Sequence, residues 1–168
     1  MSCADDVAAY IALGANLGDG AASLRAAVHD LDALPLTRVT ARSSLYRTAP
    51  QHASGPDYWN AVVAVHTALS ADALLDALLR IEAAHGRVRP VGEHNAPRQL
   101  DLDLLLYGSL QRHGPTLTLP HPRMAQRAFV LVPLAEIWPD GRLDGVALTE
   151  LAQRCLAQGQ RVSRLGPL

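Results

Sequence analysis

Two aspartates interrupt a leucine-rich run in the second half of the chain, and their spacing is suited to holding metal ions. Asp101 and Asp103 flank a single leucine within residues 100–106, an apolar run that predicts a strand. Because side chains alternate between the two faces of a strand, both carboxylates point the same way, with α-carbons about 7 Å apart. Such a pair could converge on one or two Mg²⁺ ions. The structural alternative is that the acids only mark the exposed end of a half-buried strand.

Arginines gather just before the two acids and offer partners for phosphate. Arg98 precedes Asp101 by three residues, so its guanidinium could reach phosphate oxygens beside a metal held by the acids. Arg80, Arg87 and Arg89 lie slightly earlier, in a stretch rich in glycine and proline. This composition favours a phosphate-binding loop, with a charged surface turn as the alternative.

The residue types that are missing exclude several reaction classes. All 15 basic residues are Arg, so a P-loop, the strand lysine of protein kinases and Schiff-base chemistry are ruled out. The 7 histidines lack the spacing of a zinc site, and the sequence has no Gly-x-Ser-x-Gly motif or evident cysteine nucleophile. Any nucleotide must therefore be held by arginines, backbone amides and metal.

Two further residues depart from the pattern around them. Glu82 follows Leu75 and Leu79 on one helical stripe and ends an otherwise apolar face. It either faces a site or is a boundary residue paired with a nearby arginine. His121 lies between two prolines just before a predicted helix, where backbone amides favour anions. A lone histidine in a loop is usually inert, and that alternative stays open.

Length and composition are those of one domain with a substantial core. The chain has 168 residues, 49% of them hydrophobic, and we expect residues 1–168 to form a single domain. A net charge of -1 argues against a general nucleic-acid binder, so any phosphate site is local. Cys3 and Cys155 form no CxxC pair and are interpreted as incidental. No signal-like start or run of roughly 20 apolar residues is present, so we expect a cytoplasmic protein.

Hydrophobic periodicity predicts alternating strands and helices. The predicted elements are strands at residues 7–13, 38–46, 58–67 and 100–107, and helices at residues 23–34 and 70–85. Ser70 is the expected N-cap of the second helix. The order β-α-β-β-α-β predicts an α+β fold with a ferredoxin-like antiparallel sheet and two helices on one face. Under those helices we expect the alternate leucines of the last strand, Leu100, Leu102, Leu104 and Leu106, with the two acids on the open face.

An added helical segment is predicted toward the C-terminus. Residues 122–137 carry an apolar stripe at helical spacing, with Pro122 in the first turn. Arg123 and Arg127, four residues apart, would share a different side of that helix. Residues 148–156 predict a short helix with a polar end after it, to which no role is assigned.

Six segments occur in the order and at the intervals typical of one enzyme family. They are residues 14–19 (Gly-Ala-Asn-Leu-Gly-Asp), 44–50 (Ser-Leu-Tyr-Arg-Thr-Ala-Pro), 56–61 (Pro-Asp-Tyr-Trp-Asn-Ala), 86–89 (Gly-Arg-Val-Arg), 96–103 (Ala-Pro-Arg-Gln-Leu-Asp-Leu-Asp) and 120–124 (Pro-His-Pro-Arg-Met). Together they cover nearly the whole chain. In these segments the chain resembles the 6-hydroxymethyl-7,8-dihydropterin pyrophosphokinases of folate biosynthesis.

The resemblance implies transfer of a diphosphate from ATP to the hydroxymethyl oxygen of the dihydropterin, with release of AMP. It implies two Mg²⁺ ions on Asp101 and Asp103, with Arg87 and Arg98 sharing the catalytic role. The implied pterin-binding residues are Thr48, Pro50, Tyr58, Asn60 and Phe129, and the implied ATP-binding residues are Glu82, Arg87, Arg98, His121 and Arg127. The implied partners are small molecules, without nucleic acid or membrane, and the expected form is a monomer.

The chain departs from the family pattern at a few positions. Asn95 stands where many relatives have Trp, which changes the expected closure over the pterin. Ala15 replaces the common Ser of the first turn, and the loop at residues 89–98 is a residue longer than in some relatives. From the residues alone, Phe129 could also be a core residue.

Two other functions stay open on sequence grounds. One is a ferredoxin-like small-molecule or RNA-binding module without catalysis, although such RNA-binding sheets carry aromatic residues and basic charge where this one has two acids. The other is an ordinary kinase that transfers only the γ-phosphoryl group and uses the same metals. The nucleotide product distinguishes the two kinase reactions.

Overall fold

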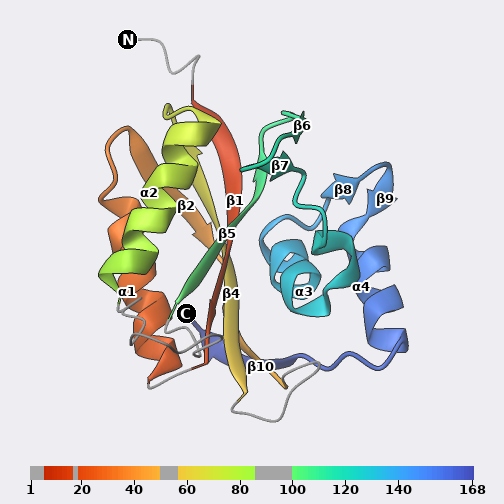
Figure 1. Ribbon diagram of the computed structural model, residues 1–168. Coiled ribbons are helices and arrows are strands. Elements are labelled where there is room, and N and C mark those ends of the chain that lie inside the picture. Colours follow the sequence, from red (N-terminus) through yellow and green to blue (C-terminus); the bar gives the residue numbers. More distant parts are fainter. Residues whose placement is uncertain (1–5, 17–18, 50–56, 86–99) are drawn as a thin grey trace.

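The computed structural model of the protein describes residues 6–16, 19–49, 57–85 and 100–168 (Figure 1). Several residues considered above lie outside these ranges, namely Cys3, Pro50, Arg87, Arg89, Asn95 and Arg98. Within the described ranges, every helix is too short or too polar to cross a membrane.

An antiparallel sheet forms the middle of the molecule. Its central strand β1 (Val7–Ala15) pairs with β4 (Tyr58–Thr67) on one side and with β5 (Asp101–Tyr107) on the other. Strands β2 (Thr37–Arg42) and β3 (Ser44–Thr48) follow one another along the outer edge of β4. All of these pairs are antiparallel, as the sequence predicted.

Two helices cover one face of this sheet. α1 (Gly20–Asp32) and α2 (Ala71–Ala84) lie side by side there, while the later helices lie on the opposite face (Figure 1). The first core, between these two helices and the sheet, includes Ile11, Leu13, Leu24, Leu31, Leu74, Leu78, Leu102 and Leu104, all 4% exposed or less. The order β-α-β-β-α-β with antiparallel pairing confirms the predicted ferredoxin-like α+β fold.

Side-chain caps explain where the two helices begin. The hydroxyl of Ser70 accepts the backbone N–H of Ala73 at 3.1 Å, which confirms the predicted N-cap of α2. The carboxylate of Asp19 accepts the N–H of Ala22 at 3.1 Å, so α1 begins three residues earlier than predicted. An aspartate N-cap satisfies a terminal amide, and here it extends the helix through small residues that show no apolar stripe.

Ser43 divides what the sequence predicts as one strand. Its N–H donates to the carbonyl of Val62 at 2.9 Å, and its hydroxyl accepts the N–H of Val62 at the same distance. A side-chain oxygen therefore replaces a backbone carbonyl in the ladder, which offsets the chain between β2 and β3. The predicted strand at residues 38–46 was wrong in this respect, because both strands pair with β4 but do so separately.

The alternation of leucines along β5 is interrupted before the strand ends. Leu102 and Leu104 belong to the first core, as predicted, but Leu105 and Leu106 both pack toward the opposite face. The register explains this, because Leu104 pairs with Ile11 and Leu106 pairs with Tyr10, leaving Leu105 as an extra residue. The prediction that Leu106 lies under the helices was therefore wrong.

The second face carries its own core beneath α3 (Ala128–Ile137) and α4 (Leu148–Ala157). The buried residues of this second core are Val62, Leu105, Met124, Ala128, Val130, Leu131, Leu134, Leu148, Ala152 and Cys155. Cys155 is buried there, and its thiol donates to the carbonyl of Ala125. The sheet is thus covered on both faces, each with a separate apolar layer.

α3 begins later than the sequence predicts. Residues 124–126 form only a short 3₁₀ turn, and Arg127 is extended with φ −123° and ψ 107°. The first amide of the helix, that of Ala128, donates to the side-chain oxygen of Gln160 at 2.8 Å. Because a partner 32 residues away satisfies this amide, nothing local marks the helix start. Pro122 is therefore not in a helix, and Arg123 and Arg127 do not share a helix face.

The last part of the chain adds two small features and one strand to the sheet. The hairpins β6–β7 (Arg112–His113 and Thr118–Leu119) and β8–β9 (Arg142–Leu143 and Val146–Ala147) precede α4. After α4, β10 (Ser163–Pro167) pairs antiparallel with β3 and forms the edge of the sheet. The sequence predicted only a polar end there.

Candidate functional site

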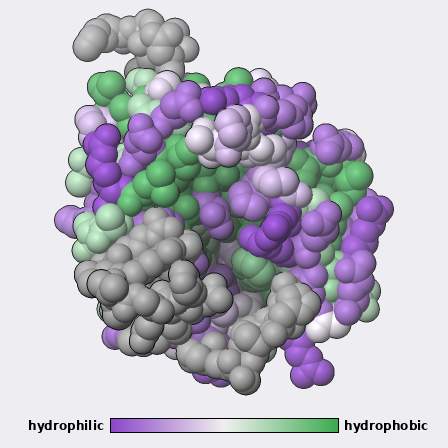
Figure 2. Space-filling view, viewed as in Figure 1, coloured by the Kyte–Doolittle hydropathy of each residue, from purple (hydrophilic) through white to green (hydrophobic). Residues whose placement is uncertain are grey.

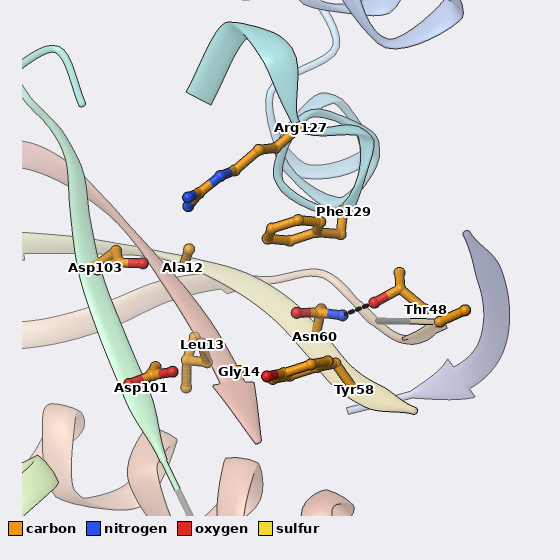
Figure 3. Close-up of a pocket in the computed structure, with 11 residues that line it drawn as sticks. Ala12, Leu13, Gly14, Thr48, Tyr58, Asn60, Asp101, Asp103, Arg127 and Phe129 are labelled. Atoms are coloured by element: carbon orange, nitrogen blue, oxygen red, sulfur yellow. Dashed lines mark hydrogen bonds between the residues drawn. The ribbon is translucent and has the colours of Figure 1, made fainter. Parts of the chain in front are cut away.

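A cavity of about 260 Å³ opens on the sheet face opposite α1 and α2. Apolar atoms in the middle of this side of the molecule lie in a recess bordered by hydrophilic residues (Figure 2). The cavity, called the first cavity below, is lined by Ala12, Leu13, Gly14, Thr48, Ala49, Tyr58, Asn60, Asp101, Asp103, Arg127 and Phe129. Its floor comes from β1, β4 and β5, and its roof comes from the start of α3 (Figure 3).

The two aspartates lie at one end of the first cavity. Asp101 pairs across the strands with Gly14, and Asp103 pairs with Ala12. Both carboxylates point into the cavity from β5 (Figure 3), away from the first core. The orientation predicted from the alternation of the strand is therefore confirmed for these two residues.

Two aromatic rings bound the other end of the cavity. Tyr58 comes from β4 and Phe129 from α3, and their rings lie on opposite sides of the open space (Figure 3). Phe129 is only partly buried, and it both packs against the second core and lines the cavity. The gap between two flat apolar faces is suited to a planar heterocycle, which would stack against both rings.

A buried amide marks the edge of this aromatic slot. Asn60 is 5% exposed, and its side-chain nitrogen donates to the hydroxyl of Thr48 at 2.8 Å (Figure 3). Its cross-strand partner is Gly14, where an added Cβ would come 3.4 Å from the Asn60 carbonyl oxygen. The hydrogen bond from Asn60 to Thr48 fixes the plane of the Asn60 amide. The polar atoms of that amide therefore face the edge of any ring held between Tyr58 and Phe129.

Arg127 links the aromatic end of the cavity to the acidic end. Its guanidinium carbon lies 5.5 Å from the centre of the Phe129 ring, which is within cation–π range. In Figure 3 the guanidinium extends over the cavity from the start of α3 toward the side where Asp103 lies. A positive group is thus available near the carboxylates for an anionic ligand.

A second cavity of about 330 Å³ lies between α2, β5 and the β6–β7 hairpin. Its lining is Leu75, Leu79, Glu82, Leu102, Asp103, Leu104, Gly114, Pro115, Thr116, Leu117, Thr118, His121 and Pro122. Asp103 therefore borders both cavities. Asp103 is thus a residue at which the two spaces adjoin.

Glu82 connects α2 to β5 within the second cavity. It is 5% exposed, and its carboxylate accepts the N–H of Leu102 at 2.8 Å. Glu82 is buried at the wall of the cavity, but the predicted stripe was wrong, because Leu79 is 44% exposed and the buried face of α2 runs through Leu74, Leu78 and Ile81. The hydrogen bond from the Leu102 N–H offsets part of the free energy that it costs to bury the Glu82 carboxylate.

His121 occupies the junction of the hairpin and the following turn. Its N–H donates to the carbonyl of Leu105 at 2.9 Å, and its Nδ1 accepts the N–H of Arg123 at 3.2 Å. Burial lowers the pKa of this ring, as do the charges of Arg127 and Arg123, while Asp103 opposes them. The neutral ring then carries its proton on Nε2, which is a hydrogen-bond donor toward an anion.

The structure gathers most of the predicted site residues around the two cavities. Thr48, Tyr58, Asn60, Asp101, Asp103, Arg127 and Phe129 line the first cavity, and Glu82, Asp103 and His121 line the second. Pro50, Arg87 and Arg98 lie outside the described residues. Over the described ranges, no three His, Cys, Asp or Glu side chains cluster in a way that could hold a metal ion.

Several lining residues were not among the predicted site residues. Ala12 and Gly14 form the floor of the first cavity, and Leu117 and Thr118 belong to the hairpin beside the second. The alternation of β1 was the available signal for Ala12 and Gly14, because both share a face opposite the apolar side chains of Ile11 and Leu13. Neither of these small residues was predicted from the sequence to line a site.

Paired carboxylates beside an arginine, a stacking slot and an adjoining cavity define a phosphate-transferring enzyme on a ferredoxin-like sheet. Residues 10–139 match the family described as 7,8-dihydro-6-hydroxymethylpterin-pyrophosphokinase (HPPK). The chain belongs to this family, as the sequence motifs predicted. It is an ATP-dependent pyrophosphokinase, a transferase of folate biosynthesis.

Relatives named as pyrophosphokinases agree with this assignment. The chain is 48% identical over 143 residues to the 2-amino-4-hydroxy-6-hydroxymethyldihydropteridine pyrophosphokinase of Methylorubrum extorquens, a match that covers 84% of this chain and 89% of the relative. It is 45% identical over 152 residues to the enzyme of that name from Pseudomonas aeruginosa, covering 89% and 93%. Both matches span nearly the full length of the relatives.

A solved structure shares the fold at low sequence identity. A Plasmodium falciparum HPPK-DHPS triple mutant, crystallised with SDX-DHP, superimposes with a TM-score of 0.72 at 13% identity. The match covers 91% of this chain and 45% of the solved chain, so this chain spans about half of that protein. The likeness supports the fold of the sheet and its helices.

Proposed function

We propose that the protein transfers the terminal diphosphate of ATP to the hydroxymethyl group of 6-hydroxymethyl-7,8-dihydropterin, forming the pterin diphosphate and AMP. The observation that carries this proposal is the position of Asp103, which borders both the aromatic cavity and the cavity beside α2. A group bound in one space can meet a group bound in the other at this carboxylate. Such an arrangement suits a transfer between two substrates.

The aromatic cavity is the proposed pterin site. Tyr58 and Phe129 would stack on the two faces of the ring, and Asn60, held by Thr48, would pair with its polar edge. The ring's hydroxymethyl arm would then extend toward Asp101 and Asp103. Pro50 is proposed as a further contact on the strength of the family motif.

The cavity beside α2 is the proposed nucleotide site. Its apolar wall of Leu75 and Leu79 suits a base, while Glu82 and His121 offer polar contacts at the opposite wall. His121 would donate from Nε2 to a phosphate oxygen, and Arg127 would neutralise charge near the acids. The family motif adds Arg87 and Arg98 to this set.

The two aspartates are the proposed holders of two Mg²⁺ ions. Carboxylate oxygens are the ligands that Mg²⁺ prefers, and two such groups on one strand face leave positions for water and phosphate oxygens. When bound, Mg²⁺ offsets phosphate charge and lowers the pKa of the attacking hydroxyl. The carboxylates of Asp101 and Asp103 therefore fit the proposed Mg²⁺ ions.

In the proposed reaction the hydroxymethyl oxygen forms a bond to the β-phosphorus. The bond between that phosphorus and the oxygen bridging to the α-phosphate breaks, AMP leaves with that oxygen, and the hydroxyl proton is released. Tyr58, Phe129 and Asn60 hold the acceptor in line, while Arg127 and His121 hold the charged donor. Most of the rate enhancement then comes from orientation and electrostatic stabilisation.

The nucleotide product tests the proposal against transfer of a single phosphoryl group. Purified protein would be given ATP, Mg²⁺ and 6-hydroxymethyl-7,8-dihydropterin, and the nucleotides separated by chromatography. We expect AMP to form in equal amount with pterin diphosphate. ADP with pterin monophosphate would establish the ordinary kinase reaction instead, and no turnover of this pterin would rule out the proposed acceptor.

A further inference from the structure

The floor between the two acids and the aromatic slot is made of the smallest side chains. Ala12 lies directly across from Asp103 on β5 and from Val62 on β4. Two residues on, Gly14 lies across from Asp101 and from Asn60. On this face of β1, therefore, only one methyl group stands between the carboxylate end of the cavity and its aromatic end.

Ala12 lies on the cavity floor between the aromatic slot and Asp103. In Figure 3 its methyl group lies between Asp103 on one side and Phe129 and Asn60 on the other. Arg127 and Phe129 line the cavity on the side opposite this floor. A larger side chain at residue 12 would fill this passage while leaving the gap between Tyr58 and Phe129 open.

We propose that Ala12 determines substrate specificity by fixing the length of the substituent that the bound ring can carry toward Asp103. This inference rests on the proposed function, because it takes the first cavity as the pterin site. Ala12 leaves room for a one-carbon arm bearing a hydroxyl. Enlarging the residue excludes the arm but not the ring, and reducing it to glycine admits a longer arm.

We expect the strand to accept valine at this position, although Ala12 also packs against the second core. Ala12 is only partly buried, and valine is a favourable residue in a strand. Ala8 provides a matched control, since it lies on the same face of β1, pairs with His66 and does not line the first cavity. Ala8→Val adds the same two methyl groups to the same strand.

The experiment compares two ligands that differ only in the arm. Dissociation constants of 6-hydroxymethylpterin and of pterin without a substituent at C6 would be measured by fluorescence titration, with Mg²⁺ and a non-hydrolysable ATP analogue present. For Ala12→Val we expect a loss of roughly tenfold or more for 6-hydroxymethylpterin, with unsubstituted pterin within about twofold of the wild type. Ala8→Val should bind both ligands as the wild type does.

A second variant tests the opposite direction. Ala12→Gly should gain affinity, relative to the wild type, for a pterin whose arm is one carbon longer. Equal losses of affinity for both ligands in Ala12→Val, or no loss for either, would overturn the inference while leaving the pterin site intact. The absence of any gain in affinity in Ala12→Gly would overturn it as well. Failure of the wild type to bind either pterin would instead overturn the proposed function, and this inference with it.

Discussion

The two aspartates of β5 have different surroundings although they share one strand face. Of the two cavities, Asp101 lines the first, whereas Asp103 lines both, and the charge of Asp103 opposes the lowering of the His121 pKa. Their common orientation follows from strand geometry, but their different neighbours come from α2, the β6–β7 hairpin and α3. Roles assigned to the pair should therefore be tested one residue at a time.

Replacing either acid should abolish most turnover without unfolding the protein. We expect Asp101→Asn and Asp103→Asn each to lower kcat by about 100-fold or more at saturating Mg²⁺, because each loses a charged oxygen ligand while keeping its shape. Steady-state kinetics and thermal unfolding would be measured together. Asp76→Asn, an exposed acid on α2, is the control and should keep wild-type kcat. A near-normal kcat in both site variants would contradict the metal assignment.

Loss of the Tyr58 ring should affect one substrate only. Tyr58→Ala is expected to weaken binding of 6-hydroxymethylpterin by about tenfold or more, since a stacking surface contributes roughly 1–3 kcal/mol. The affinity for a non-hydrolysable ATP analogue, measured by calorimetry, should stay within about twofold. Tyr58→Phe keeps the ring and should behave as the wild type. Comparable losses for both ligands in Tyr58→Ala would mean that the residue supports the scaffold and not the slot.

At the scale of elements, one carboxylate joins α3 to the edge of the sheet. Glu136 of α3 accepts the N–H of Ser44 at 2.8 Å, the hydroxyl of Ser44 at 2.6 Å and the hydroxyl of Tyr46 at 2.7 Å. Arg164 of β10 donates to the Ser44 hydroxyl at 2.8 Å. Since α3 also carries Phe129, this cluster ties the helix that forms the roof of the first cavity to the sheet.

The cluster makes stability depend on pH in a defined range. Although burial by itself raises the pKa of Glu136, the hydrogen bonds from Ser44 and Tyr46 and the charge of Arg164 bring it below its ordinary value of 4.5. The unfolded chain therefore binds more protons just below pH 4.5, so this contribution is present above that pH and is lost as the pH falls toward the native pKa.

Glu136→Gln should remove this dependence. At pH 7 we expect the variant to be less stable than the wild type by roughly 1 kcal/mol, the low end for hydrogen bonds to a charged group, because the side chain is partly open to water. The difference should shrink as the pH falls from about 5 to 3, measured by urea unfolding at each pH. Glu150→Gln on α4 alters only an exposed ion pair and serves as the control. A difference in unfolding free energy that stays constant with pH would contradict the stabilising role given to the ionised Glu136.

Local sequence signals predicted the elements that local interactions determine. The caps, apolar stripes and strand alternation gave the order of the ferredoxin-like sheet and the common direction of Asp101 and Asp103. The errors occurred where a distant partner decides the geometry. Ser43 acts through Val62, the start of α3 depends on Gln160, and the shift at Leu105 depends on pairing with β1. The floor of the cavity was missed because Ala12 and Gly14 contribute only by the absence of a large side chain.

At the scale of the whole molecule, the sheet separates two apolar layers that share their strands. Neighbouring residues of β4, Val62 and Val63, belong to the second and the first core respectively. The chain has 2 tryptophans, and one reports on each layer. Trp59 packs against the first core and would collide with any Cβ on Gly20, while Trp138 stacks on Tyr10 beside the second core with ring centres 5.1 Å apart.

Shared strands should make the two layers unfold together. Trp59→Phe and Trp138→Phe each leave one reporter, and we expect their fluorescence transitions in urea to coincide with the loss of helical circular dichroism measured on the same variant. Adding Leu131→Ala, which removes a fully buried side chain of the second core, should cost about 2–5 kcal/mol as seen by either reporter. Leu156→Ala, at a position 41% exposed, should cost far less. Separate transitions from the two reporters would show independent layers.

Because Asp103 lines both cavities, its charge would act on a ligand bound in either of them. A ligand that changes the electrostatic potential at this carboxylate from the α2 side changes the binding free energy on the aromatic side. The factor by which one ligand changes the affinity of the other must be the same in both directions, whichever ligand binds first. Cooperation between the two substrates would then follow from one shared charge on a rigid strand, with no conformational relay between the sites.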